Sequence, residues 1–347
     1  MEGNQALAEA AVRAGCRYFF GYPITPQSEI PEYLALRLPE VGGVYLQAES
    51  EVSAINMVYG AAGAGARVLT ASSSPGISLM SEGISYIAAA ELPCVIINVM
   101  RGGPGLGNIA PSQADYSQAV RGIGHGDFHL IVLAPNSVQE MADYTILAFE
   151  LADKYRNPVM ILADGLLGQM MEPVEFKKEP PKKFPKPWAT TGAKNRPRNI
   201  INTLLIDPEE LEQHNLKLQK KYERIKQEEC RCENYLTEDA EIIVAAFGSC
   251  SRIAKAAVEE ARELGIKAGL SRPITLWPFP EESVREAAQK AKACLTAEMN
   301  AGQMIYDVRM ALKDRIPVHH YGRLGGAVPT PGEILEQIKK IEVQVNG

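Results

Sequence analysis

The sequence of 347 residues lacks any C-x-x-C pair, the spacing from which zinc and iron–sulfur sites are commonly built. Its six cysteines are scattered, and Cys230 and Cys232 form a C-x-C pair in a charged, helix-like stretch. A metal or iron–sulfur site built by this chain alone is therefore not expected, with a redox or metal role for the C-x-C pair as the weaker alternative. No disulfide framework is indicated.

An excess of positive charge is also absent, because 36 Lys and Arg face 42 Asp and Glu, a net charge of −6. We expect no nucleic-acid partner, since that requires a basic surface. The least polar long stretch, residues 52–66, contains Asn56, Tyr59 and three glycines and is too short and polar to span a bilayer. Residues 1–15 have no signal-peptide pattern, so we expect a cytoplasmic protein without membrane association.

Short apolar runs alternate with helical patterns over the first half of the chain. The expected strands are 18–20, 44–47, 68–71, 94–100, 130–134 and 159–163, and the expected helices are 27–36, 51–64, 77–90 and 137–154. This alternation predicts an α/β fold with a mostly parallel sheet and helices on both faces. The runs are continuously apolar, as in strands that are buried on both faces.

Residues 172–200 break the pattern because they are rich in Pro and Lys, and they predict an extended linker. The stretch from Asp207 to Tyr235 carries a sparse apolar stripe at helical spacing, Leu211, Leu218, Tyr222 and Ile225. The simpler interpretation is a helix that lies on a surface, and the alternative is an arm that contacts a partner.

From residue 240 a second alternating segment predicts a smaller α/β domain. Its expected strands are 242–247, 268–270, 274–277, 294–297 and 318–321, and its expected helices are 251–264, 281–290, 303–313 and 332–341. We therefore divide the chain into a first domain (1–171), a linker with a charged helix (172–238) and a second domain (239–347).

Ligands of an open parallel sheet bind beyond the carboxyl ends of the strands, so the loops after the strands hold the candidate site residues. In the first loop, GYPITPQSE, Pro23 and Pro26 restrict the backbone around Thr25. The Thr25 hydroxyl is a candidate fixed hydrogen-bond donor. Equally, Thr25 or Ser28 can cap the next helix.

Glu51 begins the stretch EVSAINMVYGA and shares a helical face with Ile55, Val58 and Tyr59. A carboxylate on this buried face is costly unless it is paired, and a perturbed carboxyl group can serve as a proton donor or acceptor. The alternative is an acidic residue that complements the positive end of the helix dipole.

Two further loops carry polar groups. In TASSSPGIS, Ser74 precedes Pro75, which predicts a helix start by capping or, as the alternative, an anion site. Arg101 follows an apolar strand and precedes a glycine-rich loop, so it can clamp a carboxylate. The loop lacks the G-x-G-x-x-G spacing of a dinucleotide site. Ser112 and Asp115 in PSQADY predict a helix cap, with a role in the site as the alternative. EMNAGQ and YGRLGG of the second domain are expected at an interface.

Taken together, GYPITPQSE, QAESEVSAINMVYGAAGAGARVLTASSSPGISLM, MRGGPGLG and PSQADY resemble the 2-oxoacid:ferredoxin oxidoreductases. The resemblance is nearest to the branched-chain (3-methyl-2-oxobutanoate) enzymes and then to the 2-oxoglutarate enzymes. It implies a thiamine diphosphate-binding-type (pyrimidine domain) sheet, followed by a transketolase C-terminal-like domain. The chain has no G-D-G motif, since His125, Gly126 and Asp127 are followed by Phe128. The resemblance therefore implies that a partner subunit binds the diphosphate.

By this resemblance, Glu51 is the catalytic glutamate that hydrogen-bonds the pyrimidine ring. Thr25 and Arg101 hold the oxo and carboxylate oxygens of the substrate, and Tyr22, Pro23, Ile24 and Ser74 bind the cofactor. This chain is expected to hold no metal.

The implied reaction is oxidative decarboxylation of a 2-oxoacid with coenzyme A, giving acyl-CoA, CO₂ and reduced ferredoxin. Mg²⁺ and iron–sulfur clusters are expected on partner subunits, which include a diphosphate-binding, a gamma-type and a ferredoxin-type subunit. The same chemistry on 2-oxoglutarate or pyruvate is the alternative. A non-catalytic scaffold subunit is the alternative of another class.

Overall fold

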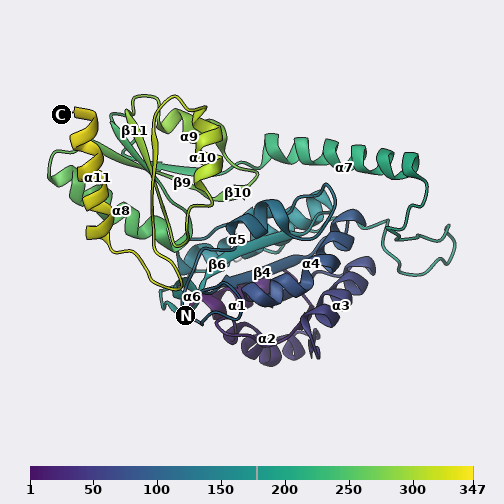
Figure 1. Ribbon diagram of the computed structural model, residues 1–347. Coiled ribbons are helices and arrows are strands. Elements are labelled where there is room, and N and C mark those ends of the chain that lie inside the picture. Colours follow the sequence, from purple (N-terminus) through teal and green to yellow (C-terminus); the bar gives the residue numbers. More distant parts are fainter. Residues whose placement is uncertain (177–178, 347) are drawn as a thin grey trace.

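The computed structural model describes residues 1–176 and 179–346, which form two α/β units, each built around its own sheet (Figure 1). Lys177 and Lys178 of the expected linker, and Gly347, lie outside the described residues. In the described part of 172–206 no regular element forms, as the Pro-rich composition predicts.

The first sheet has seven strands in the order β10-β5-β6-β4-β3-β1-β2, parallel except for β10. Its strands are β1 (Tyr18–Gly21), β2 (Val44–Gln47), β3 (Val68–Ser72), β4 (Val95–Met100), β5 (Ile131–Leu133), β6 (Val159–Asp164) and β10 (Thr275–Trp277). Every residue of β3, β4 and β6 is buried, because helices cover the centre of the sheet. This explains why most of their residues are apolar.

The helices of the first unit form two packed groups. In one group α1 (Gly3–Arg13) packs against α2 (Glu29–Glu40), α5 (Val138–Tyr155) and α6 (Gly165–Gln169). In the other, α3 (Glu51–Gly63) packs against α4 (Ser74–Ala89). A short π-helix, η1, spans Gln118–Gly122. The alternation predicted from the sequence is thus confirmed as the fold class.

The second sheet has five strands in the order β12-β11-β8-β9-β7. They are β7 (Cys232–Tyr235), β8 (Ile242–Ala245), β9 (Ala268–Pro273), β11 (Ala293–Glu298) and β12 (Val318–Gly322). The helix α8 (Gly248–Glu263) packs against α11 (Pro331–Asn346), and α9 (Glu281–Ala287) packs against α10 (Ile305–Leu312). None of the described helices has both the length and the apolar character that crossing a bilayer requires.

Two strands differ from the sequence-based expectation. The run 274–277 was expected in the second domain, but β10 pairs antiparallel with β5 at the edge of the first sheet. Residues 232–235 were expected to continue the charged helix, but β7 pairs antiparallel with β9. Both strands cover an edge that would otherwise present unpaired backbone groups. Such long-range pairing is not encoded in local periodicity, so the division of the chain at 171 and 239 stays a prediction.

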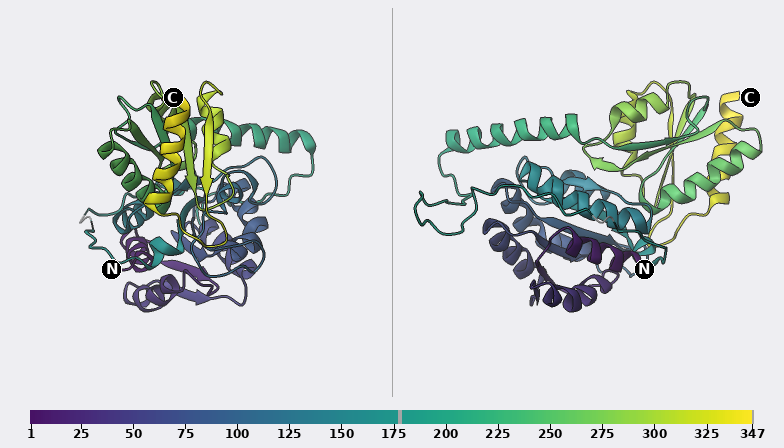
Figure 2. Two further views of the ribbon diagram at one scale, coloured as in Figure 1. Left: turned by 60° about the vertical axis from the view of Figure 1, so that its left-hand side comes forward. Right: turned by 180° about the vertical axis from the view of Figure 1, so that it is seen from behind.

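The charged helix α7 (Pro208–Glu228) extends from the second unit over the first (Figures 1 and 2). The Asp207 side chain caps it by accepting hydrogen bonds from the main-chain N–H groups of Glu209 and Glu210. Leu218, Tyr222 and Ile225 of the predicted stripe are buried, whereas Leu211 is exposed. The helix therefore lies on the surface of the first unit, and contact with a partner stays a prediction.

A fully buried glutamine of the first unit forms several hydrogen bonds to the second unit. The Gln113 side chain donates to the Phe247 carbonyl oxygen at 2.8 Å and accepts from the Met299 main-chain N–H at 3.1 Å. Asn300 donates to the Gln113 carbonyl oxygen at 2.8 Å. Because unpaired polar groups are costly inside a protein, this set of bonds contributes to fixing how the two units meet.

Candidate active site

The predicted site residues gather at the carboxyl edge of the first sheet. Glu51 begins α3 after β2, Ser74 begins α4 after β3, and Arg101 follows β4. The loop that carries Thr25 follows β1. The strands β4, β3, β1 and β2 are consecutive neighbours, so parallel pairing brings these four loops together.

The Glu51 side chain is buried, with 5% of the residue exposed, and it lies against Gly76 of α4. A Cβ atom on Gly76 would lie 2.5 Å from Glu51 Oε1 and would overlap Ser72 Oγ, so glycine at this position leaves room for the carboxylate. The predicted inward orientation of Glu51 is confirmed by this burial. Within the described residues, the Glu51 carboxylate forms no hydrogen bond.

Ser72 Oγ lies, like Glu51, beside Gly76, and the buried hydroxyl groups of Ser72 and of the next residue, Ser73, have no hydrogen-bond partner among the described residues. Unpaired buried polar groups in a native protein require an explanation, and a ligand is one. A carboxylate acceptor together with free hydroxyl groups suits a polar heterocycle such as an aminopyrimidine. These residues therefore fit the cofactor that the sequence resemblance implies.

Arg101 is also buried, with 8% exposed, and is held by main-chain oxygens. Its Nη1 donates to the Thr25 carbonyl oxygen at 3.1 Å and its Nη2 to the Leu106 carbonyl oxygen at 3.0 Å. Its Nε has no partner among the described residues. A guanidinium group has five N–H donors, so Arg101 keeps donors with which to bind a carboxylate.

Arg101 contacts the main-chain carbonyl oxygen of Thr25 and not its side-chain hydroxyl. Thr25 is exposed and lines a cavity of about 550 Å³ together with Glu29 and Ile109, whereas Arg101 lines another cavity of about 780 Å³. Helix α2 begins at Glu29, and Ser28 makes no capping hydrogen bond. The alternative that Ser28 caps this helix is therefore wrong. Whether the Thr25 hydroxyl contacts the substrate stays a prediction.

The remaining cofactor candidates lie in the same loop. Tyr22 and Pro23 are exposed and Ile24 is half-buried, and the Tyr22 carbonyl oxygen accepts a hydrogen bond from Gln27 at 3.3 Å. The structure thus places these side chains beside the sheet edge, where a ligand can reach them. Their contact with a cofactor stays a prediction.

Ser74 and Asp115 belong to one polar network with Asn98, a residue and a connection that sequence reasoning missed. Asp115 Oδ2 accepts from Ser74 Oγ at 2.6 Å and from Asn98 Nδ2 at 2.9 Å, and Asn98 Oδ1 accepts from the Ser74 main-chain N–H at 3.1 Å. The predicted capping role of Asp115 is therefore wrong, because its carboxylate binds another loop. Burial raises the pKa of the Asp115 carboxyl, and hydrogen bonds from Ser74 and Asn98 oppose this shift. The sequence did offer one sign of this network, because Asn98 is the lone polar residue in the apolar strand VIINVM.

The cavity of about 780 Å³ lies between the two units. The first unit contributes Ser74, Arg101 and Asp115, and the second contributes Met299, Asn300 and Leu324. The loops of EMNAGQ and YGRLGG therefore lie at an interface, as expected, and Asn108 Nδ2 donates to the Gly325 carbonyl oxygen at 2.8 Å. A cavity at a domain junction with convergent polar groups is the usual place for a ligand.

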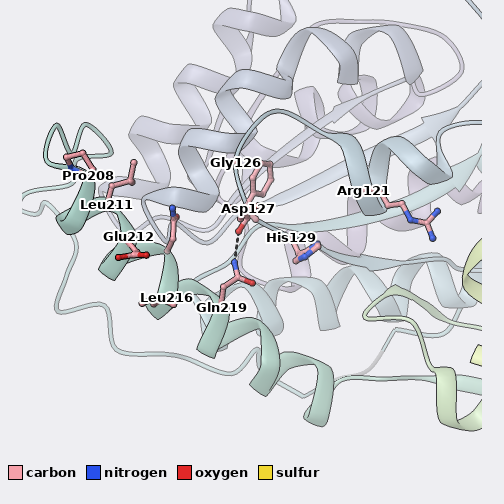
Figure 3. A pocket seen from close by; sticks show the side chains of 11 residues that line it. Arg121, Gly126, Asp127, His129, Pro208, Leu211, Glu212, Leu216 and Gln219 are labelled. Atoms are coloured by element: carbon pink, nitrogen blue, oxygen red, sulfur yellow. Dashed lines mark hydrogen bonds between the residues drawn. The ribbon is translucent and has the colours of Figure 1, made fainter. Parts of the chain in front are cut away.

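A third cavity, of about 590 Å³, lies between α7 and the loop that carries Gly126 and His129 (Figure 3). Gln219 donates to the Asp127 carbonyl oxygen at 2.8 Å across one side of it. None of the predicted site residues lines this cavity. In the part of the chain that the structure describes, no three His, Cys, Asp or Glu side chains gather as a metal site requires.

Comparison with known proteins shows to which class of protein this chain belongs. The family described as pyruvate flavodoxin/ferredoxin oxidoreductase, thiamine diP-binding, matches residues 9–234, and the pyruvate:ferredoxin oxidoreductase core domain II matches residues 240–334. The chain is thus the thiamine diphosphate-binding part of an oxidoreductase, joined to core domain II. More specifically, it belongs to the 2-oxoacid:ferredoxin oxidoreductases.

Individual relatives are similar in sequence to this chain over nearly its whole length. The ketoisovalerate oxidoreductase subunit VorB of Methanothermobacter marburgensis is 52% identical over 347 residues, which cover 100% of this chain and 98% of the relative. The 2-oxoglutarate synthase subunit KorA of Methanothermobacter thermautotrophicus is 40% identical, with 98% of each chain covered. Because these relatives are subunits of multi-subunit enzymes, the family assignment implies partner subunits.

Solved structures support the fold. The 2-oxoglutarate:ferredoxin oxidoreductase from Magnetococcus marinus, with 2-oxoglutarate, coenzyme A and succinyl-CoA bound, superposes with a TM-score of 0.87 at 29% identity. The match covers 98% of this chain but 64% of that longer chain. A split-gene transketolase matches with a TM-score of 0.64 at 16% identity, which is a likeness of fold alone.

Proposed function

We propose that this chain is the pyrimidine-binding subunit of a complex that oxidatively decarboxylates 3-methyl-2-oxobutanoate with coenzyme A. The observation that carries this proposal is the 52% identity, over the full chain, with a ketoisovalerate oxidoreductase subunit. Identity falls to 40% with a 2-oxoglutarate synthase subunit and to 30% with a pyruvate synthase subunit. The same chemistry on 2-oxoglutarate or pyruvate remains the alternative.

In the proposed reaction the C1–C2 bond of the 2-oxoacid breaks and C1 leaves as CO₂. The thiol of coenzyme A loses its proton and forms the thioester bond, and the electron pair leaves as single electrons to ferredoxin. Thiamine diphosphate, when bound, supplies the electron sink for the carbon that loses CO₂. The chain's own residues bind and orient the reactants.

The surroundings of Glu51 and Arg101 support the roles that we propose for them. The Glu51 carboxyl group, buried beside Gly76, would hydrogen-bond the ring nitrogen of the pyrimidine and exchange a proton with it. Arg101 offers its remaining N–H donors to the substrate carboxylate. The roles of the other residues rest on the family resemblance, which assigns Thr25 to the oxo oxygen of the substrate and Tyr22, Pro23, Ile24 and Ser74 to the cofactor.

The partner subunits complete the site. We propose that one partner binds the diphosphate with Mg²⁺, because this chain has no G-D-G motif. Iron–sulfur clusters then belong to a ferredoxin-type subunit, and a gamma-type subunit completes a cytoplasmic complex. The alternative of another class is a non-catalytic scaffold subunit.

The experiment is a substrate panel on the purified complex, with ferredoxin reduction as the readout. We expect kcat/KM for 3-methyl-2-oxobutanoate to exceed that for pyruvate and 2-oxoglutarate by about tenfold or more, the usual effect of a fitted apolar pocket. A preference for 2-oxoglutarate or pyruvate would overturn the substrate assignment. Full activity of the partner subunits without this chain would favour the scaffold alternative.

A further inference from the structure

The position of the Arg101 main chain depends on a side chain from another loop. The Arg101 main-chain N–H donates to Ser74 Oγ at 3.0 Å, directly before the glycine-rich loop that begins at Gly102. The Arg101 backbone also forms an isolated antiparallel bridge with Pro111, and the glycines that follow it leave the next part of the loop with more conformational freedom. The Ser74 hydroxyl adds a restraint on the Arg101 N–H that comes from a different loop.

The Ser74 hydroxyl is oriented in turn by Asp115. A hydroxyl group has one proton to donate, and Ser74 Oγ lies 2.6 Å from Asp115 Oδ2 but 3.4 Å from the Arg101 carbonyl oxygen. The shorter contact to a carboxylate is the stronger one. With its proton directed to Asp115, Ser74 presents a lone pair to the Arg101 N–H.

Asp115 is itself fixed by the second unit. Two residues earlier, Gln113 is bonded to Phe247 and Met299, and one residue later the Tyr116 hydroxyl donates to Asp307 Oδ2 at 2.6 Å. Both neighbours are fully buried. The segment 113–116 therefore connects the second unit rigidly to the Ser74 hydroxyl.

We propose that Asp115 is a positioning residue of the active site, which through Ser74 sets the place of Arg101 for binding the substrate carboxylate. The proposal rests on the proposed role of Arg101. It assigns to the second unit a part in substrate binding, because that unit holds the segment on which Asp115 lies. Asp115 also lines the same cavity as Arg101, so the network and the substrate share one space.

The test compares Asp115→Leu with Asp115→Asn in the reconstituted complex. Leucine removes the acceptor of both hydrogen bonds, whereas the asparagine oxygen can still accept them. For Asp115→Leu we expect KM for the 2-oxoacid to rise about tenfold, the effect of one lost hydrogen bond, with kcat and KM for coenzyme A changed much less. Asp115→Asn should restore most of the wild-type KM. Asp127→Asn, in an exposed loop, is the matched control.

An unchanged KM for the 2-oxoacid in a folded, assembled Asp115→Leu complex overturns the proposal. So does a parallel loss in kcat and in both KM values that Asp115→Asn does not relieve. If the leucine variant does not fold, Asp115→Ser, whose shorter side chain also loses both contacts, is measured in its place. Each KM and kcat of a variant is divided by the wild-type value, measured with the 2-oxoacid that the wild-type complex prefers. An error in the proposed substrate would therefore appear in the wild-type substrate panel and not in these ratios.

Discussion

The Arg101 guanidinium donates a hydrogen bond to the main-chain carbonyl oxygen of Thr25 at 3.1 Å, across 76 positions of sequence. This bond joins the loop after β1 to the loop after β4. Arg101 therefore shapes the Thr25 loop as well as offering donors to a ligand. The contact involves the Thr25 main chain, so a change of the Thr25 side chain alone leaves it in place.

Replacing Glu51 with glutamine keeps the size of the side chain and removes its charge. We expect kcat to fall by about 10²–10⁴-fold, the usual contribution of a positioned acid or base, while the complex still assembles. Ferredoxin reduction by the reconstituted complex measures this. Glu49→Gln, two residues earlier and exposed, is the control and should keep near-normal turnover. Near-normal turnover of Glu51→Gln would show that Glu51 is not catalytic.

Replacing Arg101 with lysine keeps the charge but loses the planar set of donors. A lysine cannot hold the Thr25 and Leu106 oxygens and a substrate carboxylate together. Since a hydrogen bond to a charged group contributes about 1.5–3 kcal/mol, we expect kcat/KM for the 2-oxoacid to fall by about 10²-fold. Steady-state kinetics test this, with Arg285→Lys on α9 as control. A wild-type KM in Arg101→Lys would contradict the carboxylate role.

Alanine at Gly76 should displace Glu51. The added methyl group would lie 2.5 Å from Glu51 Oε1 and would overlap Ser72 Oγ. We expect a loss of about 1–3 kcal/mol in unfolding free energy, typical of overpacking, together with a fall in turnover. Gly60→Ala is the matched control, because its methyl group meets nothing within 4 Å on an exposed part of α3. That variant should gain about 0.5–1 kcal/mol from better helix propensity. Equal stability of the two variants would refute the steric argument.

Acid should weaken the attachment of the C-terminal end of α7. Hydrogen bonds from Arg224, Tyr155 and Lys154 lower the pKa of Glu228 to about 2, from an ordinary value of 4.5. The pKa of Glu228 is therefore lower in the folded protein than in the unfolded chain. For this reason the ionised carboxylate stabilises the fold above pH 4.5, and this contribution is lost as pH falls toward about 2. Glu228→Gln should therefore differ from wild type at neutral pH and converge with it in acid.

Hydrogen exchange of α7 amides at several pH values measures this convergence. Glu223→Gln on the same helix is the control, since Glu223 pairs only with Lys226 among the described residues, three positions along the helix. A difference between wild type and Glu228→Gln that stays constant from pH 7 to pH 3 would rule out the proposed linkage.

The sequence by itself determined the fold class, the helix that begins at Glu51 and the inward direction of the Glu51 side chain. These follow from local periodicity, since a residue's place on a helical face depends only on its neighbours along the chain. Only the tertiary structure decided that 275–277 joins the first sheet, that Asp115 binds Ser74 and Asn98, and that Gln113 ties the two units together. Each of these depends on pairing between distant segments, which the periodicity of either segment does not contain.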